Sequence, residues 1–196
     1  MTKHVVIYVP GLGDSNYQGQ KRLIATWRLW GVRPVMCRMN WSVPEQFEAK
    51  LQRLLDMIDY YAEQGSVVSL VGSSAGAGSV LNAFALRKDK VAGVVCIAGK
   101  VNNPEAIGKE YRRNSPAFIE SAYRVQRSLD QLDFDADRPR IQSRFAWLDP
   151  VIPRRDSEVV GGNNRTMPTI GHAFTIATQL LFGAPFFLRF LQRPVR

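Results

Sequence analysis

Five short, mainly apolar runs, separated by longer helical patterns, constrain the fold of this chain more than any other feature. The runs are rich in β-branched residues and bounded by turn residues; they are Val5–Val9, Val35–Met39, Val67–Val71, Val91–Ala98 and Ile141–Leu148. Strands with one solvated face alternate between apolar and polar residues, whereas strands covered on both faces are apolar throughout. The pattern therefore predicts a mostly parallel sheet flanked by helices, a three-layer α/β sandwich.

Apolar residues at helical spacing occupy the connections between these runs. The expected helices cover about 19–30, 44–64, 75–88 and 116–132, followed by a C-terminal segment from His172 that breaks near the sequence FGAP. Ser42 with Glu45 three residues later predicts a capping box at the start of the second helix. No repeat, low-complexity tract or linker divides the sequence, so residues 1–196 are expected to form a single domain.

Composition is that of a globular protein, with 45% hydrophobic and 22% charged residues in 196. Only five apolar residues, Val5–Val9, precede Pro10, too few for the core of a secretory signal, so a cytoplasmic location is expected. Cys37 and Cys96 lie in apolar runs and are predicted to be buried free thiols rather than a disulfide or a metal pair. No Cys/His cluster has zinc spacing, and no cofactor is expected.

The net charge of +9 raises the question of a nucleic-acid partner. The basic residues are scattered among acids, and no recognition motif accompanies them, so specific nucleic-acid binding is not expected. A weak attraction of the basic protein to anionic surfaces remains an alternative. The apolar C-terminal segment is compatible with a core helix, a dimer face or a surface that rests on a membrane, and the oligomeric state is left open.

The stretch Val67–Val80, VVSLVGSSAGAGSV, passes from an apolar strand run through small residues into a helical pattern. Gly72–Gly76 in its middle reads G-x-S-x-G. A sharp turn there would hold the central Ser74 in a strained backbone conformation, and the glycines would remove collisions with a β-carbon. Ser74 is thus the candidate nucleophile, and the Ala75 N–H can bind a developing oxyanion. Tight packing is the alternative, and no Lys-Ser or Lys-Thr follows to support a phosphate loop.

A serine nucleophile needs a base and an acid that orients the base. The chain has only two histidines; His4 precedes the first strand run and is expected at the surface, which leaves His172 as the base. Asp149 follows the apolar run RFAWL directly, whereas Asp156 lies further into a polar loop. A carboxylate that orients a histidine is best held at a strand end, so Asp149 is favoured over Asp156.

The order Ser74, Asp149, His172 is that of the α/β-hydrolases. With GSSAG after a strand, LDPVIP at a strand end and GH before a terminal helix, the whole chain resembles that superfamily. It looks most like the small, capless serine hydrolases, including the retinoblastoma-binding-protein type, because about fifty residues between the fourth run and Asp149 leave no room for a large lid.

The resemblance also assigns a role to the sequence VPGLGDS after the first strand run. In relatives this loop supplies a second oxyanion donor after a His-Gly pair, which is Pro10-Gly11 here. The resemblance therefore implies Leu12 N–H as the donor, with Gly13 as second choice and as a contact to substrate. A dinucleotide motif is excluded because Asn16 stands where G-x-G-x-x-G requires its third glycine.

These residues predict a serine hydrolase that acts on carboxylic esters or related small acyl substrates through an acyl-enzyme. Trp41 and Lys100, each just past a strand run, are candidate substrate contacts, Trp41 for an acyl chain and Lys100 for a carboxylate or phosphate. A capping aromatic residue and a solvated lysine are the structural alternatives. A thioesterase, acyltransferase or peptidase using the same residues stays open, as does a non-catalytic interaction protein that retains the fold.

Overall fold

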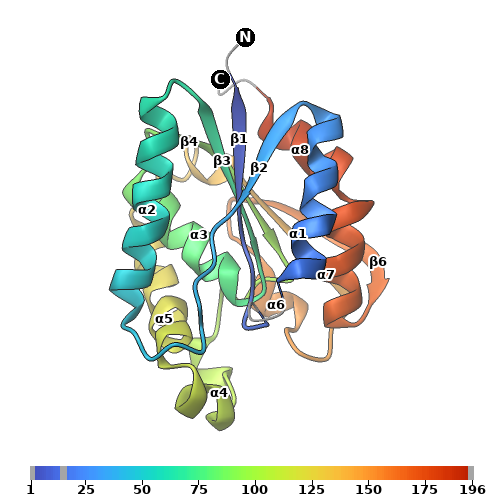
Figure 1. Cartoon of the computed structure of the whole chain (residues 1–196). Coiled ribbons are helices and arrows are strands. Elements are labelled where there is room, and N and C mark those ends of the chain that lie inside the picture. Colours follow the sequence, from blue (N-terminus) through green and yellow to red (C-terminus); the bar gives the residue numbers. More distant parts are fainter. Residues whose placement is uncertain (1–2, 14–16, 194–196) are drawn as a thin grey trace.

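The computed structural model describes residues 3–13 and 17–193 (Figure 1). These residues form a six-stranded sheet in the order β2-β1-β3-β4-β5-β6. Its strands are β1 (His4–Val9), β2 (Val32–Met36), β3 (Val67–Ser73), β4 (Val91–Ile97), β5 (Ile141–Leu148) and β6 (Asn163–Ile170). Every neighbouring pair is parallel, which confirms the predicted α/β architecture.

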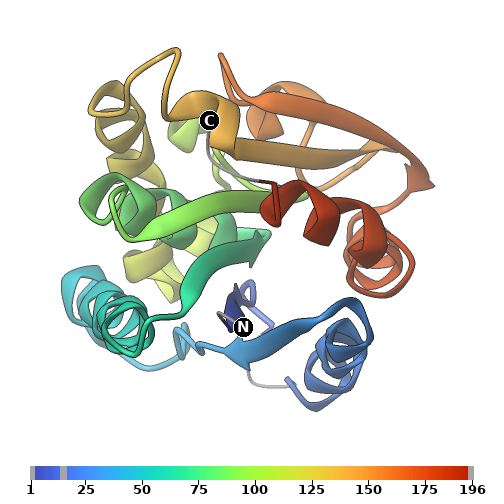
Figure 2. The same cartoon turned by 90° about the horizontal axis from the view of Figure 1, so that it is seen from above.

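Helices cover both faces of the sheet, and the view in Figure 2 shows the three layers. One face carries α2 (Phe47–Glu63), α3 (Ala75–Leu86) and α5 (Pro116–Asp130). The other carries α1 (Gln18–Ala25), the short η2 (Thr26–Trp30), α7 (His172–Leu181) and α8 (Ala184–Leu191). The remaining short helices are η3 (Pro104–Ala106), α4 (Lys109–Asn114), η4 (Arg138–Arg140) and α6 (Arg154–Ser157).

The alternation of side chains along β1 explains the two hydrophobic cores. Val5, Ile7 and Val9 pack into the cluster that holds α2, α3 and α5. Val6 and Tyr8 point the other way, into a cluster with residues of η2, α7 and α8. Because both faces of the central strands are covered, apolar residues predominate on both faces of these strands.

The two edge strands differ most from the sequence-based expectation. β2 begins at Val32 rather than Val35 and contains Pro34, which an edge strand tolerates because it needs hydrogen bonds on one side only. β6, with the sequence NNRTMPTI, has no fully buried residue and was not among the expected strands. Its polar composition lacks the apolar pattern by which the other strands were found.

The predicted capping box at Ser42 is wrong. Helix α2 begins at Phe47 after Gln46, whose side chain makes no capping hydrogen bond; the Phe47 N–H donates to Glu120 Oε2 of α5 at 3.3 Å. Glu45 instead binds Arg53. The preceding loop is organised by the fully buried Lys50, whose ammonium donates to three loop carbonyls, those of Met39, Asn40 and Val43.

Both cysteines are free and buried, as predicted. Burial raises the pKa of Cys37 to about 11 and that of Cys96 to about 12. Among the described helices, none alone is long and apolar enough to cross a membrane; α7 and α8 reach that length and composition only together, and a bend of 66° separates them. The predicted break between these two helices is thus confirmed.

Candidate active site

Ser74 occupies the turn between β3 and α3 with a backbone φ of 51° and ψ of −119°, a strained conformation for a residue with a β-carbon. The surrounding packing imposes it. A β-carbon on Gly72 would lie 2.5 Å from the Gly76 carbonyl oxygen, and one on Gly76 would lie 2.2 Å from that of Val9. The two glycines therefore let α3 approach the sheet closely enough to lift Ser74 above the carboxyl end of β3.

His172 lies beside Ser74, although 98 positions separate them in the sequence. His172 Nε2 is 3.0 Å from Ser74 Oγ, and its Nδ1 is 2.7 Å from Asp149 Oδ2. Because a carboxylate only accepts hydrogen bonds, Nδ1 carries the proton and donates to Asp149. Nε2 is then an acceptor for the Ser74 hydroxyl, which is the arrangement of a base poised to take its proton.

The Asp149 carboxylate is held rigidly at the end of β5. Its Oδ1 accepts the N–H groups of Val151 and Ile152, at 2.8 and 3.0 Å, which leaves Oδ2 for His172. The Asp149 side chain is 2% exposed and that of His172 is 15% exposed. Gly171, with a φ of 93°, makes the turn that brings His172 to the start of α7. Asp156 does not bind His172; its carboxylate pairs with Lys100.

The loop after β1 lies directly against Ser74. A β-carbon on Gly11 would be 2.8 Å from Ser74 Cβ, so glycine is required for this close approach. Leu12 and Gly13 follow and line the cavity above Ser74. On the other side, Ala75 is the first residue of α3, where a backbone N–H has no acceptor within its own helix.

A cavity of about 630 Å³ opens above Ser74 and His172. Its wall is mainly apolar and includes Leu12, Leu23, Ile107, Phe118, Ile152 and Leu180. It lies at the carboxyl ends of β1 and β3, where the order of the strands reverses, which is the usual ligand site of open parallel sheets. In the described part of the chain, no group of three or more His, Cys, Asp or Glu side chains is arranged to hold a metal ion.

Comparison with solved structures identifies the fold. A structure of LipS and LipT, two metagenome-derived lipolytic enzymes, has a TM-score of 0.69 at 12% identity, with 97% of this chain and 94% of that chain covered. MGS-MChE2, an alpha/beta hydrolase enzyme from a lagoon-sediment metagenome, has a TM-score of 0.57 at 16% identity, with 96% and 89% covered. The chain has the α/β-hydrolase fold.

The same α/β-hydrolase fold is found in the thioesterase domain from the curacin biosynthetic pathway, with a TM-score of 0.64 at 10% identity and 97% and 92% of the two chains covered. No family model matches the chain, and a search of the curated proteins finds no match. The narrower resemblance to the retinoblastoma-binding-protein type rests on the sequence alone and stays a prediction.

As expected, the connection from β4 to β5 contains no large lid on this α/β-hydrolase fold. Residues 98–140 are all described, and their longest helix, α5, packs on α3 and α2. The connection instead contributes single side chains and short segments to the cavity wall, which are Lys100, Ala106, Ile107, Gly108, Tyr111 and Phe118. The site is therefore open above Ser74.

The structure corrects the role expected for Trp41. Its side chain is buried and does not line the cavity; Nε1 donates to the Pro10 carbonyl at 3.2 Å, and the ring packs edge-on against Phe118. Trp41 therefore braces the loop that carries Leu12. The buried Lys50 in turn holds the carbonyls on either side of Trp41.

Trp41→Phe should lower kcat by about tenfold with little change in KM, because a loosened loop would fail mainly when the oxyanion forms. Kinetics with a neutral ester, beside thermal unfolding, would measure this. Trp27→Phe is the matched control, since Trp27 Nε1 donates to the buried Leu180 carbonyl on the other face of the sheet. An equal loss of kcat in both variants would contradict a specific role of Trp41.

The sequence did not indicate that Tyr8 and Ser73 form polar contacts beside the site. Tyr8 is buried, and its hydroxyl donates to Gln20 Oε1 at 2.6 Å, so it accepts from Ser73 Oγ at 2.7 Å. Ser73 is thus a hydrogen-bonding residue of the cavity wall.

His4, which was expected at the surface, is the first residue of β1. It is half-buried and bound to Ser69, and burial lowers its pKa.

Proposed function

We propose that this protein hydrolyses carboxylic esters, with Ser74 as nucleophile, His172 as general base and Asp149 as the residue that orients the histidine. One observation carries the proposal: an unbroken chain of hydrogen bonds from Ser74 Oγ through His172 to Asp149, at the floor of an apolar cavity. A scaffold protein has no physical need for these three side chains in this geometry.

In the proposed reaction, His172 Nε2 takes the proton of Ser74 as Oγ attacks the acyl carbonyl. Asp149, fixed by two backbone N–H groups, stabilises the imidazolium that forms. The tetrahedral intermediate expels the alcohol, which receives the proton from His172, and leaves an acyl group on Ser74. Water, deprotonated by the same histidine, then releases the acid and restores the serine.

The N–H groups of Ala75 and Leu12 are proposed to bind the oxyanion. The position of Ala75 at the start of α3 supports this, as does the close contact of the Leu12 loop with Ser74. Removal of one such donor typically costs about 10² to 10³ in kcat. Because both donors are backbone groups, the change from His-Gly to Pro10-Gly11 leaves the chemistry of this site intact.

The apolar cavity favours esters with hydrocarbon acyl or alcohol parts. Similar structures include lipolytic enzymes and a thioesterase domain, and thioesters react by the same attack, so both classes belong in a substrate panel. The cytoplasmic location, the absence of a cofactor and the lack of a nucleic-acid partner stay predictions from the sequence.

A fluorophosphonate probe tests the proposal, because it reacts with an activated serine but not with an ordinary one. We expect the wild type to be labelled and Ser74→Ala to be unlabelled. Ser73→Ala is the matched control: it removes the neighbouring hydroxyl, and labelling should persist. Mass spectrometry of the labelled peptide would place the adduct on Ser74.

Turnover of p-nitrophenyl esters and acyl thioesters of graded chain length would follow. A folded wild type that neither reacts with the probe nor hydrolyses any member of the panel would contradict the proposal. It would favour the non-catalytic interaction protein, whose partners would then be sought among anionic molecules because the chain has a net charge of +9.

A further inference from the structure

The wall of the cavity is chemically divided. On the side of α1 and α7 it consists largely of apolar side chains, among them Leu23, Ile176 and Leu180. In another part of the wall, the loop after β4 and helix α6 contribute three charged residues, Lys100, Arg155 and Asp156. The proposed ester chemistry does not use this charged corner.

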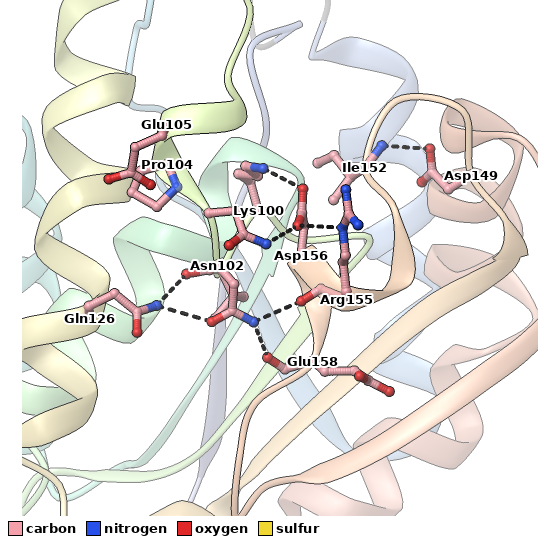
Figure 3. A network of polar contacts seen from close by, with 12 residues as sticks. Lys100, Asn102, Pro104, Glu105, Gln126, Asp149, Ile152, Arg155, Asp156 and Glu158 are labelled. Atoms are coloured by element: carbon pink, nitrogen blue, oxygen red, sulfur yellow. Dashed lines mark hydrogen bonds and ion pairs between the residues drawn. The ribbon is translucent and has the colours of Figure 1, made fainter.

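Lys100 is almost fully buried, and its ammonium lies 2.5 Å from Asp156 Oδ2, with the two side chains 7% and 4% exposed. Figure 3 shows both side chains pointing toward one another. The backbone fixes Asp156: its N–H donates to the Pro153 carbonyl, and its own carbonyl accepts the N–H groups of Val101 and Asn102. The loop after β4 and the loop after β5 are thereby joined, and Lys100 is held at the cavity wall.

The charges of this corner do not cancel. Asp156 Oδ1 accepts from Asn103 Nδ2 at 2.6 Å and lies 3.8 Å from Arg155 Nε, so one carboxylate faces two cations. A lysine ammonium has three donors, and Asp156 is the one acceptor of Lys100 Nζ within the described residues. The Arg155 side chain is 80% exposed and lines the cavity.

Neighbouring acids do not remove this excess of positive charge. Glu158 forms an ion pair with Arg154 at 2.7 Å, outside the cavity lining. Helix α4, at the rim, carries three basic residues and one acid, and Glu105 is exposed just before it; the basic residues are Lys109, Arg112 and Arg113. The side of the cavity nearest α6 is therefore positive, whereas the part near α1 and α7 is largely apolar.

We infer that Lys100 and Arg155 bind an anionic group of the substrate, a carboxylate or a phosphate, while the reacting ester lies at Ser74. The inference rests on the proposed function and narrows it to esters whose acid or alcohol part carries a second, negative group. A cation held in an apolar wall attracts an anion more strongly than one in water, and a charge-assisted hydrogen bond is about twice as strong as a neutral one. Asp156 keeps Lys100 in position between substrates.

The test compares anionic esters with neutral esters of matched chain length or ring skeleton. On the acyl side, p-nitrophenyl monoesters of adipate, suberate and sebacate are set against neutral p-nitrophenyl alkanoates of equal length. On the leaving-group side, 4-acetoxybenzoate and 4-acetoxyphenyl phosphate are set against the methyl ester of 4-acetoxybenzoate. We expect kcat/KM for the best anion to exceed that of its neutral match by about tenfold at low salt, and added salt to reduce this ratio.

Single substitutions should raise or lower the anionic-to-neutral ratio, which is kcat/KM for an anionic ester divided by kcat/KM for its neutral match. Arg155→Gln should lower the anionic-to-neutral ratio about fivefold, because it removes a cation from the cavity wall. Asp156→Asn should raise the ratio, since asparagine still accepts from Lys100 but no longer carries a negative charge. Arg154→Gln is the matched control: the adjacent arginine does not line the cavity, so the same loss of charge should leave the ratio unchanged.

Binding without turnover separates this inference from the proposed function. Calorimetry with the Ser74→Ala protein would compare monomethyl suberate with dimethyl suberate, and Arg155→Gln in that background should weaken only the binding of the anion. The inference would be overturned if the anionic-to-neutral ratio of kcat/KM were one or less for every ester pair, or if Arg155→Gln left that ratio and the binding of the anion unchanged. Ester hydrolysis by Ser74 would stand in either case. Anion binding with no turnover of any ester would instead overturn the proposed function.

Discussion

His172→Ala is expected to lower kcat/KM for a neutral ester by about 10⁴, because Ser74 then has no base to take its proton. Among the described residues, the hydrogen-bond partner of Ser74 Oγ is His172 Nε2, so no other side chain is in position to replace the histidine as the base. Ser74→Ala should have an effect of similar size. Steady-state kinetics with p-nitrophenyl esters, on proteins whose thermal midpoints match the wild type, would measure both.

The double variant Ser74→Ala/His172→Ala tests whether the two residues act together. Because Ser74 and His172 act as one unit, the loss in Ser74→Ala/His172→Ala should be no greater than in either single variant. Additive losses would show that the two residues act independently. His4→Ala is the control for loss of a histidine, since His4 lies in β1 and binds Ser69, outside the cavity lining.

Asp149→Asn is expected to lower kcat/KM by about 10³ to 10⁴ while the fold persists. The asparagine oxygen can still accept the N–H groups of Val151 and Ile152, and its amide group then faces His172 Nδ1. An amide donor there favours the tautomer with its proton on Nε2, which cannot accept from Ser74.

Asp156→Asn is the matched comparison, since both acids follow β5 and both are buried. Its carboxylate binds Lys100 and not His172, so kcat/KM for the same neutral ester should fall by less than about tenfold. The opposite ranking of the two variants would assign the orienting acid to Asp156, against the geometry of the site.

Local patterns in the sequence are enough to predict much of this protein. Buried parallel strands favour mainly apolar runs, and all five expected runs overlap strands of the sheet. The G-x-S-x-G turn can also be recognised from the sequence, although only Gly72 is required by a contact within the turn, whereas Gly76 is required by the carbonyl groups of Val9 and Pro10. The edge strand β6 was missed because a solvated strand needs no apolar pattern.

The order of Ser74, Asp149 and His172 along the chain pointed to a site, but a sequence carries no distances. Asp149 and Asp156 are both plausible acids by sequence; folding decides between them by turning one carboxylate toward His172 and the other toward Lys100. Likewise, the position of Trp41 just past a strand suggests a residue that lines the crevice. Only the packing shows that its indole N–H instead donates to the Pro10 carbonyl.

The sequence by itself thus determined the class of fold, the position of the turn at Ser74 and the residues available for its chemistry, because buried strands and the G-x-S-x-G turn each leave a recognisable pattern in consecutive residues. Only the tertiary structure decided which side chains line the cavity, since its walls come from loops that meet at one edge of the sheet. The positive corner of Lys100 and Arg155 is of this kind: its charge depends on Asp156, which lies 56 positions from Lys100.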